Sequence, residues 1–235
     1  MLGARAQDAC SIVVAVLLLA LSDRSRTSDT ARLAHVGLLG YLAYSYLIYV
    51  TGVPMNRMFL VYVAILALSG AGFLAGVWEI LSRPLPSRHT RRLRLGTGWM
   101  LLSTAVLFAG LWLSTLLPFA LGGAAPDPEG VGGTPYPVFW LDLAITLPAV
   151  AAVGMLLLRD RPSGPAFAVV ALIKIVTLFT ALWAGPVTAA LSGSTVHLGP
   201  DAVPSLLLLG ASTWLVVRWL RTTGPARPDP RLLER

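Results

Sequence analysis

Apolar residues fill seven stretches of the chain, and short polar segments separate them. A helix that spans a bilayer needs roughly 20 mostly apolar residues, and the stretches recur at about that length. The pattern predicts an all-α fold, a polytopic membrane helix bundle of about seven transmembrane helices. The predicted spans are residues 9–22, 33–51, 58–81, 95–117, 137–158, 165–185 and 203–220.

The first stretch has two interpretations. Residues 9–22 are short for a span and resemble the apolar region of a signal peptide, with Arg5 ahead of them. Seven spans place 15 arginines on the side of the C-terminus and only Arg5 and Arg57 on the other. Because cytoplasmic loops are enriched in basic residues, this asymmetry predicts an outside N-terminus and a cytoplasmic C-terminus. It also favours a retained helix, since cleavage would leave residues 23–32 and their three arginines outside.

Composition supports a single membrane domain. The chain has 235 residues, of which 56% are hydrophobic and 12% charged, and its mean hydropathy is +0.74. We expect one transmembrane domain over residues 1–222 and a polar, disordered cytoplasmic tail over residues 223–235. Arginine stands almost everywhere in place of lysine, and alanine, glycine and proline are abundant, as in proteins from GC-rich bacterial genomes. The predicted location is therefore a bacterial cytoplasmic (inner or plasma) membrane.

The net charge of +7 has a simple interpretation in this setting. The segment at residues 82–94 is rich in arginine, is typical of a cytoplasmic loop and favours contact with anionic lipid headgroups. Without interleaved aromatic residues or a soluble domain, nucleic-acid binding is not expected. The predicted headgroup contacts are Arg83, Arg88, Arg91, Arg92 and Arg94.

One charged residue stands in the middle of a predicted span. Lys174 is the only lysine of the chain and lies nine residues into the span 165–185, about 13 Å from its start. A lysine there costs roughly 2.5–3.5 kcal/mol on insertion scales unless it finds a partner. Two acids compete for that role, Glu79 near the end of one span and Asp142 near the start of another. Because side chains lean toward the N-terminus of their helix, Lys174 and Glu79 converge in depth, so we favour that pair over Lys174 and Asp142.

Other polar residues share faces with these charges. Tyr41 and Tyr44 lie deep in their span, need buried partners for their hydroxyls, and are predicted to line the same cavity as Asp142. Asp142 itself requires Thr146, a tyrosine or water if Glu79 takes the lysine. Helical spacing places three sets on common faces, namely Ser69, Gly72, Gly76 and Glu79, then Asp142, Thr146, Ala149 and Val153, and finally Lys174, Thr177 and Ala181. The candidate intramembrane polar site consists of Lys174, Asp142, Glu79, Tyr41, Tyr44, Thr146 and Thr177.

Motifs of common site chemistries are missing from the sequence. The single cysteine, Cys10, excludes an intramolecular disulfide, and the three histidines have neither zinc nor bis-haem spacing. A serine hydrolase elbow, a phosphate-binding loop and an acidic magnesium motif are also absent. We therefore expect no metal and no cofactor, and no catalytic residue can be named.

Two segments carry a resemblance. Residues 41–69 (YLAYSYLIYVTGVPMNRMFLVYVAILALS) and 139–164 (FWLDLAITLPAVAAVGMLLLRDRPSG), followed by LIK at 172–174, resemble a group of uncharacterised bacterial multi-pass integral membrane proteins. Members share a tyrosine-rich helix, an LDL segment before a proline and a later intramembrane lysine. The resemblance implies the same architecture and no assigned activity. Its matching positions are Tyr41, Tyr44, Asn56, Asp142, Pro148 and Lys174.

Three classes of function fit these observations. The first is a transport-like or ligand-binding membrane protein built around a polar intramembrane cavity, and we place it first. The second is a membrane-embedded enzyme that acts on a lipid-soluble substrate, similar to small terpene cyclases, with Asp142 or Glu79 as general acid. The third is a non-catalytic assembly subunit whose charges only fix helix packing. An activity as an enzyme is the less favoured interpretation.

Overall fold

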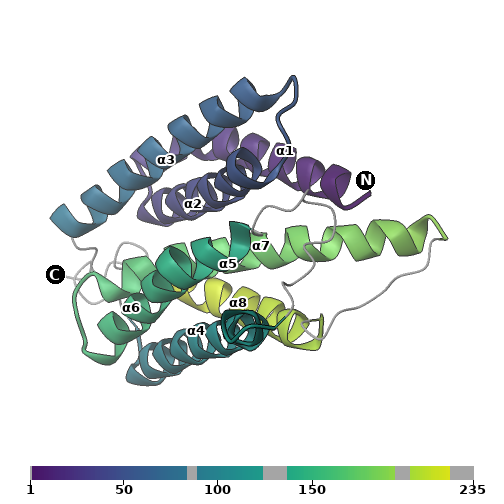
Figure 1. Cartoon of the computed structure of the whole chain (residues 1–235). Coiled ribbons are helices and arrows are strands. Elements are labelled where there is room, and N and C mark those ends of the chain that lie inside the picture. The colour runs from purple at the N-terminus through teal and green to yellow at the C-terminus, as the bar shows by residue number, and fades with distance from the viewer. Residues whose placement is uncertain (1, 84–88, 124–136, 194–201, 223–235) are drawn as a thin grey trace, which may run out of the picture.

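The computed structural model describes residues 2–83, 89–123, 137–193 and 202–222, with side chains from residue 8 onward. Within these ranges the regular structure is helical throughout (Figure 1). The predicted tail and most of the loop between 120 and 137 lie outside the described residues. The elements are α1 (Leu2–Ser22), the short 3-10 helix η1 (Arg24–Arg26), α2 (Asp29–Gly52), α3 (Phe59–Ser82), α4 (Arg91–Ala120), α5 (Pro137–Leu141), the π-helical turn η2 (Asp142–Thr146), α6 (Leu147–Leu158), α7 (Gly164–Leu191) and α8 (Ala202–Thr222).

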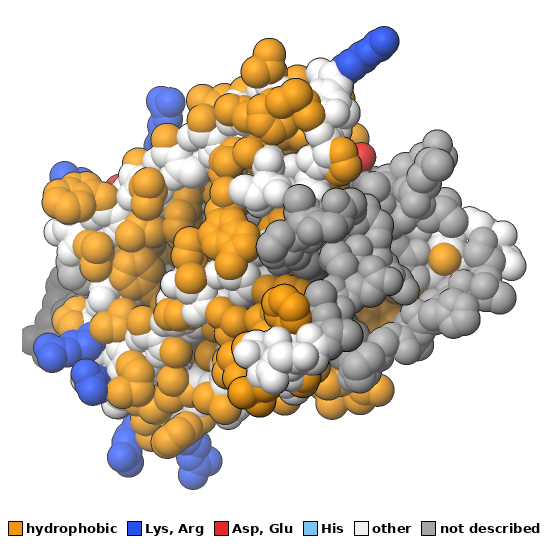
Figure 2. Space-filling model, viewed as in Figure 1, with side chains coloured by type: hydrophobic (Ala, Val, Ile, Leu, Met, Phe, Trp, Pro, Cys, Tyr) orange, Lys and Arg blue, Asp and Glu red, His pale blue; other side chains and the backbone are white. Residues whose placement is uncertain are grey.

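Six helical segments of the described part of the chain are long and apolar enough to cross a membrane. They are α2, α3, α4, the continuous segment Pro137–Leu158, α7 and α8, while the apolar part of α1, Asp8–Ser22, is shorter. The face of the molecule in Figure 2 is largely hydrophobic, and side chains such as Leu60 and Leu68 are more than 70% exposed. Water-soluble monomers rarely expose so much apolar surface, which favours a membrane protein.

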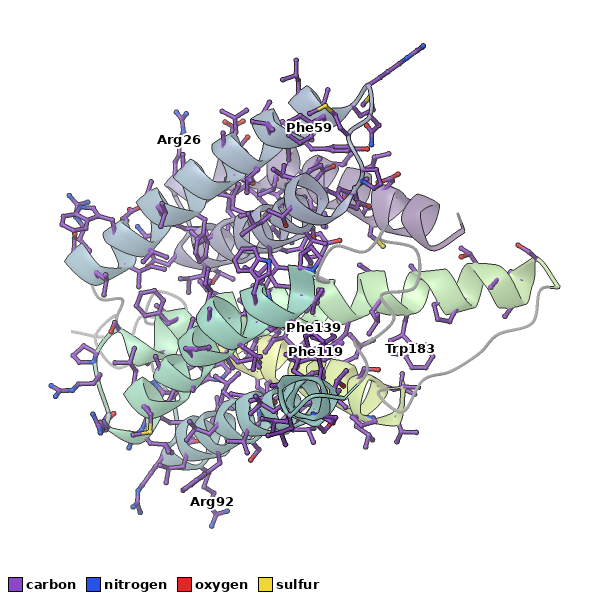
Figure 3. The ribbon with its side chains drawn as sticks, in the orientation of Figure 1. Arg26, Phe59, Arg92, Phe119, Phe139 and Trp183 are labelled. Carbon is purple, nitrogen blue, oxygen red and sulfur yellow. The ribbon has the colours of Figure 1, made fainter. Side chains whose placement is uncertain are left out.

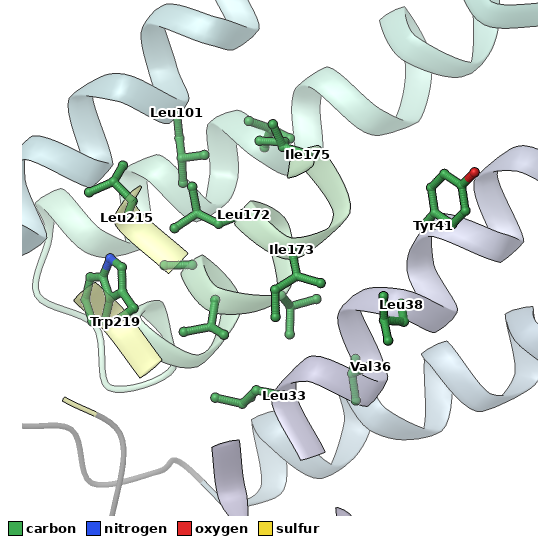
Figure 4. Packing of buried hydrophobic residues seen from close by; sticks show 14 of the residues in the cluster. Leu33, Val36, Leu38, Tyr41, Leu101, Leu172, Ile173, Ile175, Leu215 and Trp219 are labelled. Carbon is green, nitrogen blue, oxygen red and sulfur yellow. The ribbon is translucent and has the colours of Figure 1, made fainter. Parts of the chain in front are cut away.

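Helix α7 lies at the centre of the bundle. It packs against α1 and α2 on one side and against α6 and α8 on the other. We call α1–α3 the first helix group, and α4–α6 with α8 the second helix group. Figure 4 shows Leu172 and Ile173 of α7 between Leu33 and Val36 of the first group and the buried Leu101, Leu215 and Trp219 of the second. The apolar core is therefore continuous through α7.

Helices α2 and α3 form a close antiparallel hairpin, and the small residues predicted to share a face of α3 do contact α2. A Cβ on Gly72 would lie 3.0 Å from Leu39, and one on Gly76 would overlap Val36. Ser69 is buried on the same face and donates to the Ile65 carbonyl. The small side chains allow the two helix backbones to approach closely, as small residues do in membrane bundles.

The start of α4 differs from the prediction of a loop that continues to residue 94. Thr90 caps the helix by accepting a hydrogen bond from the Leu93 amide at 3.2 Å, so α4 begins at Arg91. Arg94 then points into the bundle, where Nη1 donates to the Leu157 carbonyl at 2.6 Å and lies 3.2 Å from Asp160. Arg94 therefore satisfies a carbonyl at the end of α6 and is buried.

Helix α7 also extends beyond its predicted end. It continues through Pro186 to Leu191, although the Gly185–Pro186 pair suggests a break after residue 185. A proline removes one backbone donor, and the following residues Val187 to Leu191 include good helix formers, so the helix persists. The far end of α7 projects past its neighbours in Figure 1, and Trp183 there donates to Ser205 of α8 at 3.1 Å.

The arginines collect at one end of the bundle, which we call the arginine-rich end. Arg26 and Arg92, which belong to the first and second helix groups respectively, both point outward there (Figure 3). The described residues of this end are Arg24, Arg26, Arg32, Arg83, Arg91, Arg92, Arg94, Arg159, Arg161, Arg218 and Arg221.

The contact between Gly76 and Val36 predicts an effect on stability. We expect Gly76→Ala to lower the free energy of unfolding by about 1–3 kcal/mol, because the added methyl group must displace buried Val36. Gly70→Ala is the matched control on the same helix, since a Cβ there meets no atom within 4 Å. Thermal unfolding of both variants in detergent micelles measures the difference. Equal stability of the two variants would contradict the close packing of α2 on α3.

Candidate functional site

Asp142 is a buried carboxylate that joins three helical segments. It lies in η2, and its side chain belongs to a residue only 7% exposed. The Tyr44 hydroxyl of α2 donates to Oδ1 at 2.9 Å, and the Trp112 indole Nε1 of α4 donates to Oδ2 at 3.0 Å. Both oxygens therefore accept a hydrogen bond, which suits an ionised carboxylate because that form only accepts. Tyr44 and Asp142 connect the first helix group to the second.

Lys174 lies beside this carboxylate without touching it. Its Nζ is 3.8 Å from the centroid of the Tyr44 ring, in the geometry of a cation–π contact. Asp142 is the charged group whose field acts on Lys174. Among the described residues, neither a carboxylate within 4.0 Å nor a hydrogen-bond acceptor is found for this ammonium, and the residue is partly exposed. Tyr44, Trp112, Asp142 and Lys174 are called the Asp142–Lys174 site below.

Aromatic rings enclose the second-group side of the Asp142–Lys174 site. Phe139, labelled in Figure 3, meets the Trp112 ring edge-on at a centroid distance of 5.2 Å. Phe108 lies 6.4 Å from Trp112 and 5.9 Å from Phe179 of α7. Asp142 is buried beside these rings, so its attraction for a nearby cation is stronger than at a surface.

A wide helical turn determines where Asp142 points. In η2 the Leu147 amide donates to the Asp142 carbonyl, five residues back, and Pro148 follows without an amide hydrogen. Such a turn adds one residue to the helix and shifts the following side chains by about 100°. The predicted companions of Asp142 were Thr146, Ala149 and Val153. The buried stripe instead consists of Leu147, Val150, Gly154 and Leu157, with the first three each one residue later than predicted.

This shift explains why Thr146 is not a partner of Asp142. The partners predicted for Asp142 are Thr146, a tyrosine or water, and the structure shows a tyrosine, Tyr44. Thr177 is on the predicted face of α7 one turn from Lys174, but its hydroxyl donates to the Ile173 and Lys174 carbonyls at 2.9 and 3.0 Å. Tyr41 lies on the neighbouring face of α2 and turns toward Ser11 of α1, not toward Asp142. The site therefore unites Lys174, Asp142 and Tyr44 from the predicted set.

Glu79 does not pair with Lys174, contrary to the preference drawn from depth. Its Oε1 accepts a hydrogen bond from Arg32 Nη1 at 2.6 Å, and Nη2 of the same arginine is 2.7 Å from Asp29. Arg32 lies 20 residues before the end of α2, and Glu79 lies 20 residues after the start of α3. A tight hairpin places such residues side by side. Depth along one helix carries no information about which helices are neighbours, so it does not reveal this arginine.

Trp112 is the site residue that the sequence analysis did not identify. It lies 8 residues before the end of α4, and Asp142 lies 5 residues after the start of α5. Two antiparallel helices therefore bring them to nearly the same depth. An indole N–H at the depth of a buried carboxylate is the signal that would have found this hydrogen bond.

The chemistry open to the Asp142–Lys174 site follows from its groups. The carboxylate is held by two donors, and the ammonium keeps its three N–H donors for another molecule. The site suits recognition of a hydrogen-bond acceptor or an anion at Lys174. Among the described residues, no three His, Cys, Asp or Glu side chains come together as a metal site.

Comparison with known proteins supplies no further assignment. No protein-family model, no curated protein and no solved structure matches this chain. The resemblance to uncharacterised bacterial membrane proteins therefore remains a prediction, and the function is argued from the site alone.

Proposed function

We propose that the chain crosses a bacterial plasma membrane seven times, with its N-terminus outside and its arginine-rich end in the cytoplasm. The distribution of arginine supports this orientation. Helix α1 supports the seventh span, because its 21 residues measure about 31 Å and it packs on α2 and α7. Arg83, Arg91 and Arg92 are exposed at the arginine-rich end, which supports contact with anionic headgroups. Arg94 is occupied within the bundle, and Arg88 lies outside the described residues.

The function that we propose is binding and transport-like passage of a small molecule at the Asp142–Lys174 site. The single observation that carries it is the Lys174 ammonium, which meets an aromatic face but no described acceptor. A cation–π contact contributes about 0.5–2 kcal/mol, whereas a lysine at the centre of a membrane costs about 2.5–3.5 kcal/mol. The field of Asp142 offsets part of this difference, and acceptors in contact with Lys174 offset the rest. A ligand carrying a carboxylate, phosphate or carbonyl oxygen supplies them.

The position of the site between the helix groups supports transport over static binding. Tyr44 belongs to the first helix group, Trp112 and Asp142 belong to the second, and Lys174 extends from α7 between them. A ligand at Lys174 contacts both groups, so its binding free energy depends on their relative position. Secondary transporters place their substrate sites in such positions, near the membrane centre and beside interrupted helices. The π turn at Asp142 is an interruption of this kind.

The enzyme alternative receives less support. A general acid must give up a proton during the reaction. Both oxygens of Asp142 accept hydrogen bonds from donors, and Glu79 is paired with Arg32. Neither acid is therefore presented as a proton donor to a lipid-soluble substrate.

Access of water to the site tests the proposal. In a Cys10→Ser background, we expect Thr177→Cys to react with a small, membrane-impermeant thiol reagent, because residue 177 shares the Lys174 face of α7. Thr180→Cys is the matched control, since Thr180 is exposed on another face of the same helix and meets lipid instead of water. Labelling in oriented membrane vesicles is followed by mass spectrometry. Failure of both cysteines to react would show a dry, packed interior and would remove the basis for transport.

The hydrogen bonds to Asp142 predict a second result. Trp112→Phe should lower the free energy of unfolding by about 1.5–3 kcal/mol, because one oxygen of a buried carboxylate loses its donor. Trp99→Phe is the control on the same helix, where the indole is 62% exposed. Thermal unfolding in detergent micelles measures both. If the two variants are equally stable, Asp142 does not depend on the indole.

A further inference from the structure

Three buried hydroxyl groups meet between α1 and α2, away from the Asp142–Lys174 site. Ser11, Tyr41 and Ser45 are only 4%, 0% and 1% exposed. The Ser11 and Ser45 side chains lie close enough to the Tyr41 hydroxyl to act on it as hydrogen-bonding groups, and Ser11 also lies near the Tyr46 hydroxyl. None of these contacts has the geometry of a direct hydrogen bond, so the oxygens of Ser11, Tyr41 and Ser45 have no such partner among the described residues. The Tyr41 hydroxyl points away from the apolar cluster in Figure 4. The three groups are close together without satisfying one another.

These serines behave differently from most hydroxyl residues of the bundle. A serine or threonine inside a helix can donate to the carbonyl three or four residues back. Ser69, Thr104 and Thr180 all do so, at 2.6 to 2.8 Å. The buried hydroxyls of Ser11 and Ser45, like that of Ser212 in α8, have no such carbonyl partner. Ser11 and Ser45 differ from Ser212 in lying beside the Tyr41 hydroxyl, which is the second observation that indicates a bound molecule.

The chemistry of the three groups defines that molecule. Each hydroxyl both donates and accepts, no charged side chain is among them, and each oxygen is inaccessible from the surface. An unsatisfied buried hydroxyl costs about 1–3 kcal/mol, and three of them in one place would be a large penalty. A water molecule makes about three hydrogen bonds when it is buried in a protein. An anion or a cation would find no opposite charge.

We infer that a single water molecule binds Ser11, Tyr41 and Ser45 and joins α1 to α2 within the membrane. One of its hydrogen-bond partners belongs to α1 and two belong to α2. The same two helices are also joined by an exposed hydrogen bond from the Tyr49 hydroxyl to Asp8, at 3.1 Å. The water bridge lies deeper in the bundle than this bond. Together with buried Val14, the water fixes the position of α1 against the rest of the first helix group.

Two measurements test the bridge. In a density map of the full chain that resolves other ordered waters, a peak within hydrogen-bond distance of all three oxygens is expected in the wild type. The peak should be lost in Tyr41→Phe. A wild-type map that shows other buried waters and no peak here would overturn the inference, whether or not the variants fold.

Stability provides the second measurement. Tyr41→Phe and Ser45→Ala should each lower the melting temperature in detergent micelles, and the double variant should lower it by little more than the larger single effect, because both remove the same water. Ser69→Ala is the control, since that buried hydroxyl is already satisfied within its helix, and it should change the melting temperature less. Additive effects of Tyr41→Phe and Ser45→Ala would overturn the inference, because independent hydroxyls share no ligand.

Discussion

The attraction between a buried carboxylate and the polar groups of three other helices determines how the two halves of this bundle meet. Apolar packing alone is non-directional and tolerates many relative positions of the helices. The hydrogen bond from Tyr44 to Asp142 has a fixed length and direction and selects one position of the first helix group, while the bond from Trp112 holds the carboxylate within the second group. Lys174 depends on the same arrangement, because its aromatic contact is the ring whose hydroxyl holds the carboxylate. The positions of the buried charges, the register of the helices and the contact between the two helix groups therefore depend on one another.

The helices were predictable because a bilayer imposes a length and a composition on each span. All seven predicted stretches correspond to helical segments, and their bounds differ where a cap or a proline acts locally, as at Thr90 and Pro186. The lateral arrangement of helices was not predictable in the same way. Depth can be counted along one helix, whereas adjacency depends on packing between helices. For that reason Asp142 and Lys174 were recognised as site candidates, but Glu79 was assigned to the wrong cation.

Two other residues show what kind of information a linear pattern lacks. The sequence predicts Arg94 to be a surface charge like Arg91 and Arg92, yet its side chain donates to a carbonyl at the end of α6. Trp112 reads as one tryptophan among several, yet its N–H meets Asp142. In both cases the partner lies in another helix more than 25 positions away along the chain. Counting residues outward from the turn of an antiparallel helix pair places Arg32 at the depth of Glu79. The same count places Trp112 close to the depth of Asp142.

The π turn has a consequence for the ancestry of this chain. A wide turn is equivalent to one residue inserted into an ordinary helix, and here five residues lie between an aspartate and a proline. A relative with only four intervening residues would keep both amino acids and still turn the carboxylate out of the interior. Distant relatives that share this architecture should consequently be recognised by the spacing of Asp142 and Pro148, which an alignment that permits a gap at this point would erase.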